Sequence, residues 1–428
     1  KNSVLLLSSL VFYGWGERKY LIFMLAAILQ GYLFGLLVDK FRGTKKSKLF
    51  MIISVVLSLG LLGYCKYADF FITNFNAVTG LSIPLLKIAL PIGISFYTFQ
   101  ILSYTVDVYR GEVPSQKNII NFAAYVTMFP QLIAGPIVRY SDVAAQLESR
   151  THTMDKTALG VRRFAIGLSK KILIANVLGE LVSAFKSSDE KSVLFAWMYA
   201  IAYTLHIYFD FSGYSDMAIG LGKIFGFDFL ENFNYPYISS SITEFWRRWH
   251  MSLGSWFRDY LYIPLGGNRV PKWRWLLNLF IVWMATGFWH GAEWNFIVWG
   301  LMYAVLLISE KLWLKGMPKA IGHIYTLLFV ILGFVIFDAS SLSDGIGNIG
   351  SLFGAGGLPA VTDETLYYLR SYGVILIIAA VGATPLPSKI VERIRKATVG
   401  DKAMVVLEPV ALVVMLAVCT AFLVDGSF

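Results

Sequence analysis

Long apolar runs with few or no charged residues recur along the whole chain, and they limit its possible folds more than any other feature. A membrane-spanning helix needs roughly 20 apolar residues to cross the hydrocarbon layer. Such runs lie at 20–38, 49–65, 88–106, 118–138, 192–209, 275–292, 294–309, 320–337, 371–388 and 403–424, and Val4–Trp15 is a further short candidate. The runs predict an all-α membrane protein with many spans.

The composition supports a bilayer as the surroundings of this chain. Only 15% of its 428 residues are charged and 57% are hydrophobic, whereas soluble domains carry about 25% charged residues. A soluble enzyme, a disordered chain, a collagen and a disulfide scaffold are therefore excluded. The net charge of +10 is explained by basic residues on the cytoplasmic side of a membrane. Because no nucleic-acid-binding motif accompanies it, we expect no nucleic acid as a partner.

Four basic clusters indicate how the spans are oriented. The clusters lie at 40–48, 269–274, 311–319 and 389–402. If all four are cytoplasmic, the spans between them alternate consistently, and the Gly-rich, acidic-leaning stretch 338–370 lies outside. The glycines at 345–357 follow no predicted strand and precede no Gly-Lys-Ser/Thr, so we expect a flexible loop there rather than a phosphate-binding loop.

Two stretches in the middle of the chain cannot form simple spans. Residues 139–187 and 210–274 mix charged, aromatic and apolar side chains, which predicts amphipathic or re-entrant helices packed against the bundle. Cys65 and Cys419 both lie in apolar runs, so packed thiols are expected rather than a disulfide or a metal pair. No internal repeat is visible, which disfavours an inverted-repeat transporter.

His290 lies where two apolar runs almost meet, in the string Thr286–Trp294. Histidine is costly in lipid, so a histidine in this place is a candidate for function. Gly287 and Gly291 allow close backbone approach. A neutral imidazole can act as a general base because its ordinary pKa is close to the working pH. A packed, hydrogen-bonded histidine is the alternative.

His250 lies in a string of aromatic and basic residues, Ile242–Ser252. If the string is helical, Glu244 and Arg248 pair at i,i+4, and Trp246 shares a face with His250. The mixture is typical of a helix at the membrane interface. A structural role for this histidine remains as open as a catalytic one.

A polar island in otherwise apolar sequence surrounds Asp210, which follows His206 by four residues. Buried carboxylates need partners, and we expect Asp210 to pair with Arg247, Arg248 or Arg258. A metal site is the weaker alternative, because neither His-x-x-x-His nor a cysteine pair is present. The sequence assigns no role to the remaining histidines, His152 and His323, and no Gly-x-Ser-x-Gly predicts a serine hydrolase.

Long strings in the chain resemble the membrane-bound O-acyltransferase family. The strings that carry this resemblance are Ser241–His250, Phe257–Arg269 and Trp289–Gly291. Other strings are similar to the branch with the membrane subunits of bacterial alginate and other polysaccharide O-acetyltransferases: Phe209–Ala218, Leu90–Phe96, Val106–Gly111 and Leu132–Pro136. The likeness runs from about Val4 to Leu314.

The resemblance implies a single membrane domain over 1–428, with a motif-bearing part at about 4–314 and C-terminal helices at 315–428. Its fold would be a bundle of about 11–12 transmembrane helices, with amphipathic or re-entrant helices around a central funnel or tunnel. Proteins of this family usually have a further hydrophobic segment at the N-terminus, so we expect this N-terminus to be incomplete.

The resemblance also implies the chemistry. An acetyl group would pass from acetyl-CoA across the cytoplasmic (inner) membrane to a hydroxyl, for O-acetylation of an extracellular or cell-wall polysaccharide with an extracytoplasmic acetyltransferase-like partner protein. His290 corresponds to the family's invariant histidine and His250 to a second, supporting one. No metal is implied.

Further residues are expected to support the site or line the substrate channel. They are Asp210, Tyr214, Trp246, Arg247, Arg248, Arg258, Asp259, Asn268 and Trp289. Asn268 or a tryptophan N–H would aid the oxyanion, and Arg269 would attract the phosphates of CoA.

Two other functions stay open. A D-alanyl transfer protein of the teichoic-acid type would use a carrier-protein thioester instead of acetyl-CoA, although Pro264–Arg269 favours the acetyl branch. A glycan transporter or scaffold without chemistry is the alternative of another class.

Overall fold

The structure is a computed structural model, and it describes residues 1–425 apart from the side chains of residues 398–401. In this part of the chain every regular element is a helix. Six of the described helices are long and apolar enough to cross a membrane: Leu21–Lys40, Lys45–Lys66, Trp294–Leu312, Lys319–Asp338, Asp363–Gly382 and Lys402–Asp425. The prediction of an all-α protein with several membrane spans is confirmed.

The chain divides into two compact units, and the first comprises residues 1–160, 221–230 and 255–265. The complete helices of this unit are α1 (Asn2–Gly16), α2 (Leu21–Lys40), α3 (Lys45–Lys66), α4 (Ala68–Thr79), α5 (Ile94–Arg110), α6 (Ile119–Thr127), α7 (Phe129–Leu132), α8 (Tyr140–Glu148) and the π-helical turn η3 (Arg258–Tyr262). It also holds the first residues of α9 (Met154–Ser169), which continues into the second unit.

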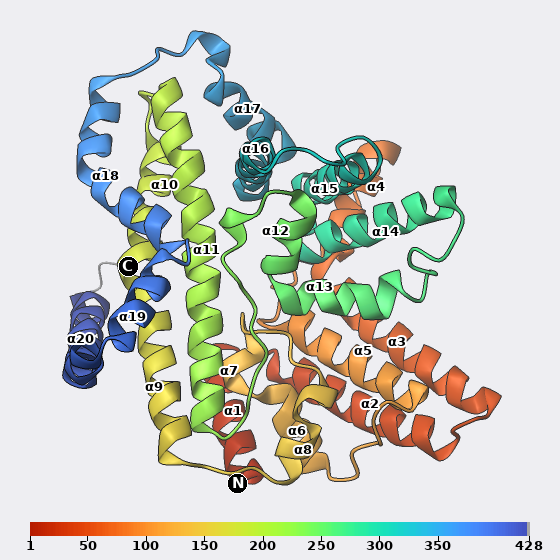
Figure 1. The fold of residues 1–428 in the computed structure, drawn as a ribbon. Coiled ribbons are helices and arrows are strands. Elements are labelled where there is room, and N and C mark those ends of the chain that lie inside the picture. Colours follow the sequence, from red (N-terminus) through yellow and green to blue (C-terminus); the bar gives the residue numbers. More distant parts are fainter. Residues whose placement is uncertain (426–428) are drawn as a thin grey trace. The chain divides into compact units, whose positions relative to one another are not determined.

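Three helices of the first unit, α2, α3 and α5, pack side by side (Figure 1). A Cβ on Gly35 of α2 would come within 2.5 Å of the Tyr104 ring on α5, so only glycine allows this approach. Small residues at helix contacts are the usual means of close packing in membranes.

The second unit comprises residues 161–220 and 231–254 and the chain from 266 onward. Besides the rest of α9, the elements that lie before residue 266 are the π-helix η1 (Lys170–Asn176), α10 (Val177–Ser187), α11 (Val193–Ile224), η2 (Pro236–Ile238), α12 (Ile242–Arg248) and α13 (Met251–Phe257). The last residues of α11 and α13 belong to the first unit. The later elements are α14 (Lys272–His290), α15 (Trp294–Leu312), α16 (Lys319–Asp338), α17 (Leu342–Leu352), η4 (Ala355–Gly357), α18 (Asp363–Gly382), α19 (Leu386–Lys396) and α20 (Thr398–Asp425).

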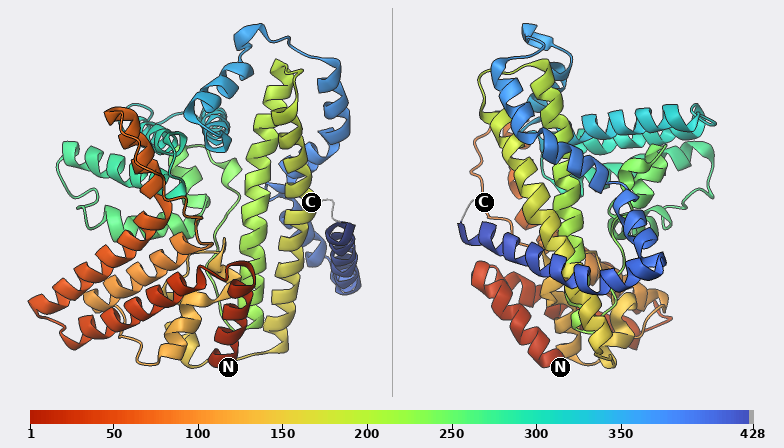
Figure 2. Two further views of the ribbon diagram at one scale, coloured as in Figure 1. Left: turned by 180° about the vertical axis from the view of Figure 1, so that it is seen from behind. Right: turned by 60° about the vertical axis from the view of Figure 1, so that its left-hand side comes forward.

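In the second unit, α9 and α11 lie side by side in both views of the ribbon (Figures 1 and 2). They cross where Gly167 meets Gly213, because a Cβ on Gly213 would come within 2.8 Å of the Gly167 carbonyl oxygen. The polar island at 210–216 therefore lies within one long helix and packs against α9. The expectation that residues 210 onward form a separate amphipathic or re-entrant stretch was wrong for this part.

Three apolar or glycine-rich stretches differ from their predictions. The run 118–138 is divided, because α6 ends at Thr127 and a separate short helix, α7, begins at Phe129 with Pro130 in its first turn. The run 371–388 stops at Gly382, where α18 ends, and α19 follows after Pro385. The expected flexible loop at 345–357 was wrong: most of it is helix α17, whose N-cap Ser341 accepts a hydrogen bond from the Asp344 N–H.

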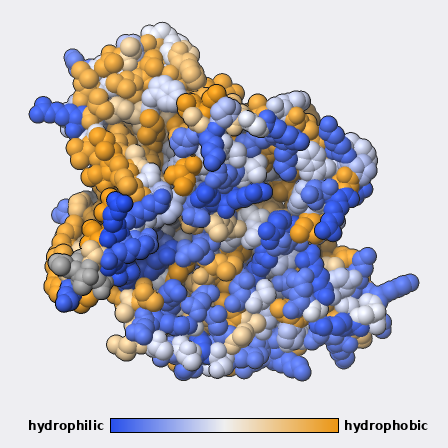
Figure 3. Space-filling model, viewed as in Figure 1, coloured by the Kyte–Doolittle hydropathy of each residue, from blue (hydrophilic) through white to orange (hydrophobic). Residues whose placement is uncertain are grey.

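Cys65 and Cys419 are buried free thiols, as expected. Cys65 belongs to the first unit and Cys419 to the second. On the surface, hydrophobic residues cover α18, as expected for a helix that contacts lipid, while hydrophilic residues gather at α19 (Figure 3).

Candidate functional site

A tight helical hairpin of α14 and α15 positions His290. His290 is the last residue of α14, and α15 begins at Trp294. The two helices touch through glycines: a Cβ on Gly287 would overlap the carbonyl oxygen of Phe296, and a Cβ on Gly300 would lie 3.2 Å from the Gly287 Cα atom. The imidazole is thereby carried at a close-packed helix end inside the second unit.

Aromatic rings surround His290. The centroid of its ring lies 4.9 Å from that of Trp289, 5.2 Å from that of Trp299 and 5.1 Å from that of Phe337, each with an edge-to-face orientation. Trp299 is 1% exposed. These contacts restrict the orientation of the imidazole, which is itself only partly buried.

His250 has an unusual backbone. α12 ends at Arg248 and α13 begins at Met251, and between them His250 has a φ angle of +44°. This left-handed conformation costs a non-glycine residue energy and is found most often at functional sites. The expectation that Trp246 and His250 share one helix face was wrong, because the helix ends before His250.

The tautomer of His250 follows from its hydrogen bonds to Asn232. The amide oxygen of Asn232 accepts from the N–H and the hydroxyl of Ser252 (3.3 and 2.8 Å), while its amide nitrogen donates to Ser215 Oγ (3.0 Å). Asn232 Oδ1 also lies 3.1 Å from His250 Nδ1. An amide oxygen can only accept, so His250 Nδ1 carries the proton and Nε2 keeps its lone pair.

The lone pair of His250 is buried and without a partner. The residue is 3% exposed, and its Nε2 atom has no hydrogen-bond partner among residues 1–425. His250 lies outside the six candidate spans. Burial, and secondarily the charge of His290, hold its pKa well below the ordinary value. His250 is therefore a neutral imidazole with an open acceptor atom.

The two predicted histidines meet at Trp289. Its ring centroid lies 6.3 Å from that of His250 and 4.9 Å from that of His290. The sequence singled out all three residues, although 40 positions separate the two histidines. It missed Asn232, which fixes His250, because an asparagine in the loop 231–235 has no spacing that marks it.

Three hydrogen-bond donors near His290 are buried and have no partner within the described part of the chain: Trp246 Nε1, Trp299 Nε1 and Tyr303 Oη. Their rings touch, since the centroid of Trp246 lies 5.5 Å from that of Trp299 and 4.8 Å from that of Tyr303. An unsatisfied buried donor costs about 1–3 kcal/mol, so this cluster is suited to a substrate oxygen. The sequence named Trp246 but not Trp299 or Tyr303.

The charged residues predicted beside His250 have other partners. Arg248 pairs with Glu244 at 2.9 Å, as the i,i+4 spacing predicted, and Arg247 is exposed. Asp210 pairs with Lys171 of η1, so the expected pair with Arg247, Arg248 or Arg258 was wrong. The π-helical turn places Lys171 against α11. No residue spacing in the sequence predicts that turn. Tyr214 is partly buried on α11.

Arg258 and Asp259 belong to the first unit. Asp259 pairs with Arg258 (2.7 Å) and with Arg139 (2.8 Å), and both Arg139 and Arg110 contact the ring of Tyr260. The Tyr260 hydroxyl in turn donates to the carboxylate of Asp107 at 2.7 Å. In the first unit these residues form a structural network.

Asn268 and Arg269 are exposed in the turn before α14. His290 ends that helix, whose 19 residues correspond to about 27 Å along its axis. The turn folds back on α14, since Asn278 donates to the Gly267 carbonyl oxygen, but Asn278 is still 12 residues, or about 18 Å along the axis, from His290. The structure therefore does not bring Asn268 to His290, whereas the ring of Trp299 contacts His290.

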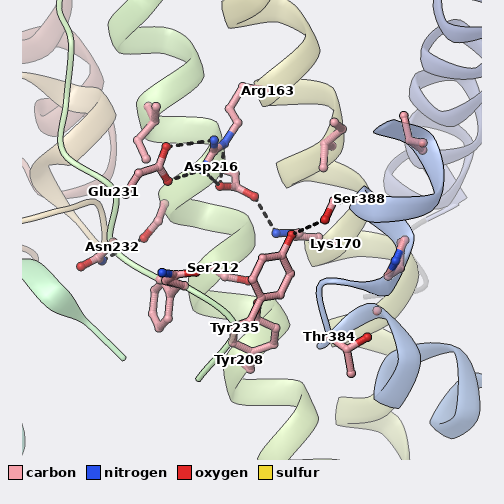
Figure 4. A pocket seen from close by; sticks show the side chains of 18 of the residues that line it. Arg163, Lys170, Tyr208, Ser212, Asp216, Glu231, Asn232, Tyr235, Thr384 and Ser388 are labelled. Atoms are coloured by element: carbon pink, nitrogen blue, oxygen red, sulfur yellow. Dashed lines mark hydrogen bonds and ion pairs between the residues drawn. The ribbon is translucent and has the colours of Figure 1, made fainter. Parts of the chain in front are cut away.

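A cavity of about 960 Å³ opens on the other side of Asn232 (Figure 4). Asp216 forms part of its wall and accepts from Arg163 Nε (2.8 Å) and Lys170 (2.7 Å), while Arg163 also pairs with Glu231. Asn232 lines the cavity and also holds His250, which does not itself line the cavity. Among the described residues, no group of three or more His, Cys, Asp or Glu could hold a metal ion.

Comparison with known proteins identifies the family. The sequence model of the membrane-bound O-acyltransferase family matches residues 19–343. The chain is 45% identical over 351 residues to the probable alginate O-acetylase AlgI of Pseudomonas aeruginosa, covering 80% of this chain and 68% of that protein. It is 35% identical over 389 residues to the peptidoglycan O-acetyltransferase of Helicobacter pylori, covering 83% of this chain and 74% of that protein.

A more distant relative has another activity in its name. The teichoic acid D-alanyltransferase of Bacillus subtilis is 29% identical over 271 residues, which cover 58% of this chain and 68% of that protein. The family match covers the hairpin of α14 and α15 and both histidines. This chain is an acyltransferase with several membrane spans, and it belongs to the membrane-bound O-acyltransferase family.

Proposed function

We propose that this protein transfers an acetyl group from acetyl-CoA to a hydroxyl for the O-acetylation of a cell-wall or extracellular polysaccharide. The observation that carries the proposal is the meeting of His250 and His290 at Trp289 among aromatic rings. Relatives whose names state O-acetylation of alginate or peptidoglycan support the choice of acetyl group and glycan.

His290 is the general base of this proposal. Its imidazole takes the proton of the acceptor hydroxyl while the hydroxyl oxygen attacks the carbonyl carbon of the thioester. The tetrahedral intermediate then collapses, the C–S bond breaks, and the CoA thiolate takes the proton back from the imidazolium. The products are an acetyl ester and free CoA, and His290 is again neutral.

The buried donors beside His290 stabilise the charge that develops on the carbonyl oxygen. Trp299 Nε1 is the first candidate, because its ring contacts His290 directly and its N–H has no partner among the described residues. Donors that are already oriented in a site without water stabilise an oxyanion more than donors in water do.

His250 is the supporting histidine of the proposal. Its proton is held on Nδ1 by Asn232, so its Nε2 lone pair is available to a proton from the acceptor or from water near His290. Because burial keeps it neutral, it adds no positive charge beside the base.

The basic clusters support a proposal for the cellular setting. We place the protein in the cytoplasmic membrane, with acetyl-CoA reaching the site from the cytoplasm. A separate extracytoplasmic transferase is the proposed recipient of the acetyl group on the other side, and it would modify the polysaccharide. Arg269 stays a candidate contact for the phosphates of CoA, at the exposed start of α14.

A comparison of two acyl donors tests the proposal. Purified protein in detergent is given a hydroxyl acceptor with either acetyl-CoA or a D-alanyl carrier-protein thioester. We expect ester formation and free CoA thiol with acetyl-CoA, and no transfer of D-alanine. D-alanyl ester formed in place of acetyl ester would favour the alternative, a D-alanyl transfer protein, which the distant relative supports. No ester with either donor would contradict the proposed acetyl transfer.

A further inference from the structure

The short helix α19 (Leu386–Lys396) is tethered to the boundary between membrane and water. Only three residues separate it from the end of the candidate span α18, at Gly382, and the next candidate span begins at Lys402. A helix of 11 residues is about 16 Å long, too short to cross the hydrocarbon layer. It must therefore lie near the membrane surface at which the span before it ends and the span after it begins.

One face of α19 is apolar and about half exposed. Leu386, Ile390 and Ile394 follow one another at intervals of four residues and so share a face. They are 51%, 51% and 42% exposed. In water this row would be unfavourable, whereas acyl chains would bury it.

A second face is basic. Lys389, Arg393 and Lys396 are exposed beside the apolar row. Lys396 pairs with Glu392 at 2.7 Å, while Lys389 and Arg393 have no ion-pair partner in the described part of the chain. A basic face next to an apolar face is typical of a helix that lies in the plane of an anionic membrane surface.

The third face of α19 points into the second unit and is held by polar contacts. Its residues Ser388, Val391, Glu392 and Arg395 line the large cavity. The Tyr235 hydroxyl donates to Ser388 Oγ at 3.1 Å, as Figure 4 shows. Arg395 pairs with Glu408 of α20, which also pairs with Arg162 of α9.

From these three faces we infer that α19 is an in-plane membrane helix that binds anionic lipid and closes the cavity from the membrane side. Leu386, Ile390 and Ile394 lie among the acyl chains. The side chains of the basic face contact lipid phosphates, and the inner face forms a wall of the cavity. The partner is the anionic bilayer surface, and the inference is independent of the acetyl-transfer proposal.

The depth of α19 in defined bilayers tests the inference. The full chain, with Cys65→Ser and Cys419→Ala, is labelled with a nitroxide at Ile390→Cys or at Arg393→Cys and placed in nanodiscs of phosphatidylcholine with or without phosphatidylglycerol. With the anionic lipid, we expect the label at 390 to be accessible to oxygen and shielded from a water-soluble nickel complex, and the label at 393 to show the reverse.

Neutral variants separate a lipid contact from a general charge effect. Each basic residue near an anionic surface favours the membrane-inserted state about fivefold. The variant K389Q/R393Q/K396Q is therefore expected to lower the ratio of inserted to detached α19 by about 100-fold. This ratio is measured with the label at 390. The matched control K45Q/K46Q/K48Q removes three exposed charges from the first unit and is expected to leave that ratio unchanged. Equal nickel accessibility at 390 and 393 with the anionic lipid, or the same depth with and without it, would overturn the inference.

Discussion

His290→Ala is expected to lower the rate of acetyl transfer about 10²- to 10⁴-fold, because general-base catalysis contributes a factor of this size. The protein should stay folded in the membrane, since the hairpin that carries His290 is held by the contacts of Gly287 and Gly300 rather than by the imidazole. The rate is measured as free CoA thiol released in the presence of a hydroxyl acceptor.

His323→Ala is the matched control for this variant. His323 lies on α16 of the same unit, is partly buried, and uses Nδ1 in one hydrogen bond to the Ser239 carbonyl oxygen (3.1 Å). Loss of that imidazole should leave the rate within about threefold of the original, because removing one hydrogen bond changes stability by only about 1 kcal/mol. Similar losses in both variants would point to damaged packing instead of a missing base.

Asn232→Ala is expected to have the second-largest effect, a fall in kcat of about 10² or more with the KM for acetyl-CoA nearly unchanged. The amide oxygen of Asn232 is the acceptor that keeps the proton of His250 on Nδ1, and holding a catalytic histidine in the wrong tautomer costs up to about 10⁴ in other enzymes. Steady-state rates over a range of acetyl-CoA concentrations separate kcat from KM.

Asn232→Asp distinguishes tautomer control from a structural role. A carboxylate still accepts from Nδ1 and also raises the pKa of His250. We therefore expect partial recovery of kcat, with the acid limb of the pH–rate profile moved to higher pH because His250 must be neutral to act. Ser215→Ala, which removes only the acceptor for the Asn232 amide nitrogen, should have a smaller effect. Equal losses and identical pH profiles for the alanine and aspartate variants would contradict tautomer control.

Much of the fold follows from the apolar runs, because the bilayer requires long unbroken helices. The runs 294–309 and 320–337 correspond within a few residues to α15 and α16. Sequence hydropathy led to wrong predictions where single residues determine where a helix begins or ends. Pro130 divides one run, and a serine N-cap stabilises α17 despite its glycines. Hydropathy averaged over a span does not register such single residues.

The site could be predicted only in part. His290 was recognisable from its place between two apolar runs, and His250 from the string around it. Asn232, Trp299 and Lys171 were not recognisable, because their roles depend on contacts between distant segments. Asn232 contacts the turn before α13, Trp299 contacts the end of α14, and Lys171 pairs with a residue of α11. The periodicity of a single sequence carries no information about such pairings.

Acetyl transfer across a sealed bilayer tests the central claim most directly. The protein is reconstituted in proteoliposomes with labelled acetyl-CoA outside and a small hydroxyl acceptor inside, which replaces the separate transferase. Protein molecules in the inward-facing and outward-facing orientations are counted separately. We predict labelled acetyl ester inside, with one free CoA thiol released outside for each ester formed, and both products formed about 10²- to 10⁴-fold more slowly with His290→Ala. Ester formation by His290→Ala at the original rate would contradict the account.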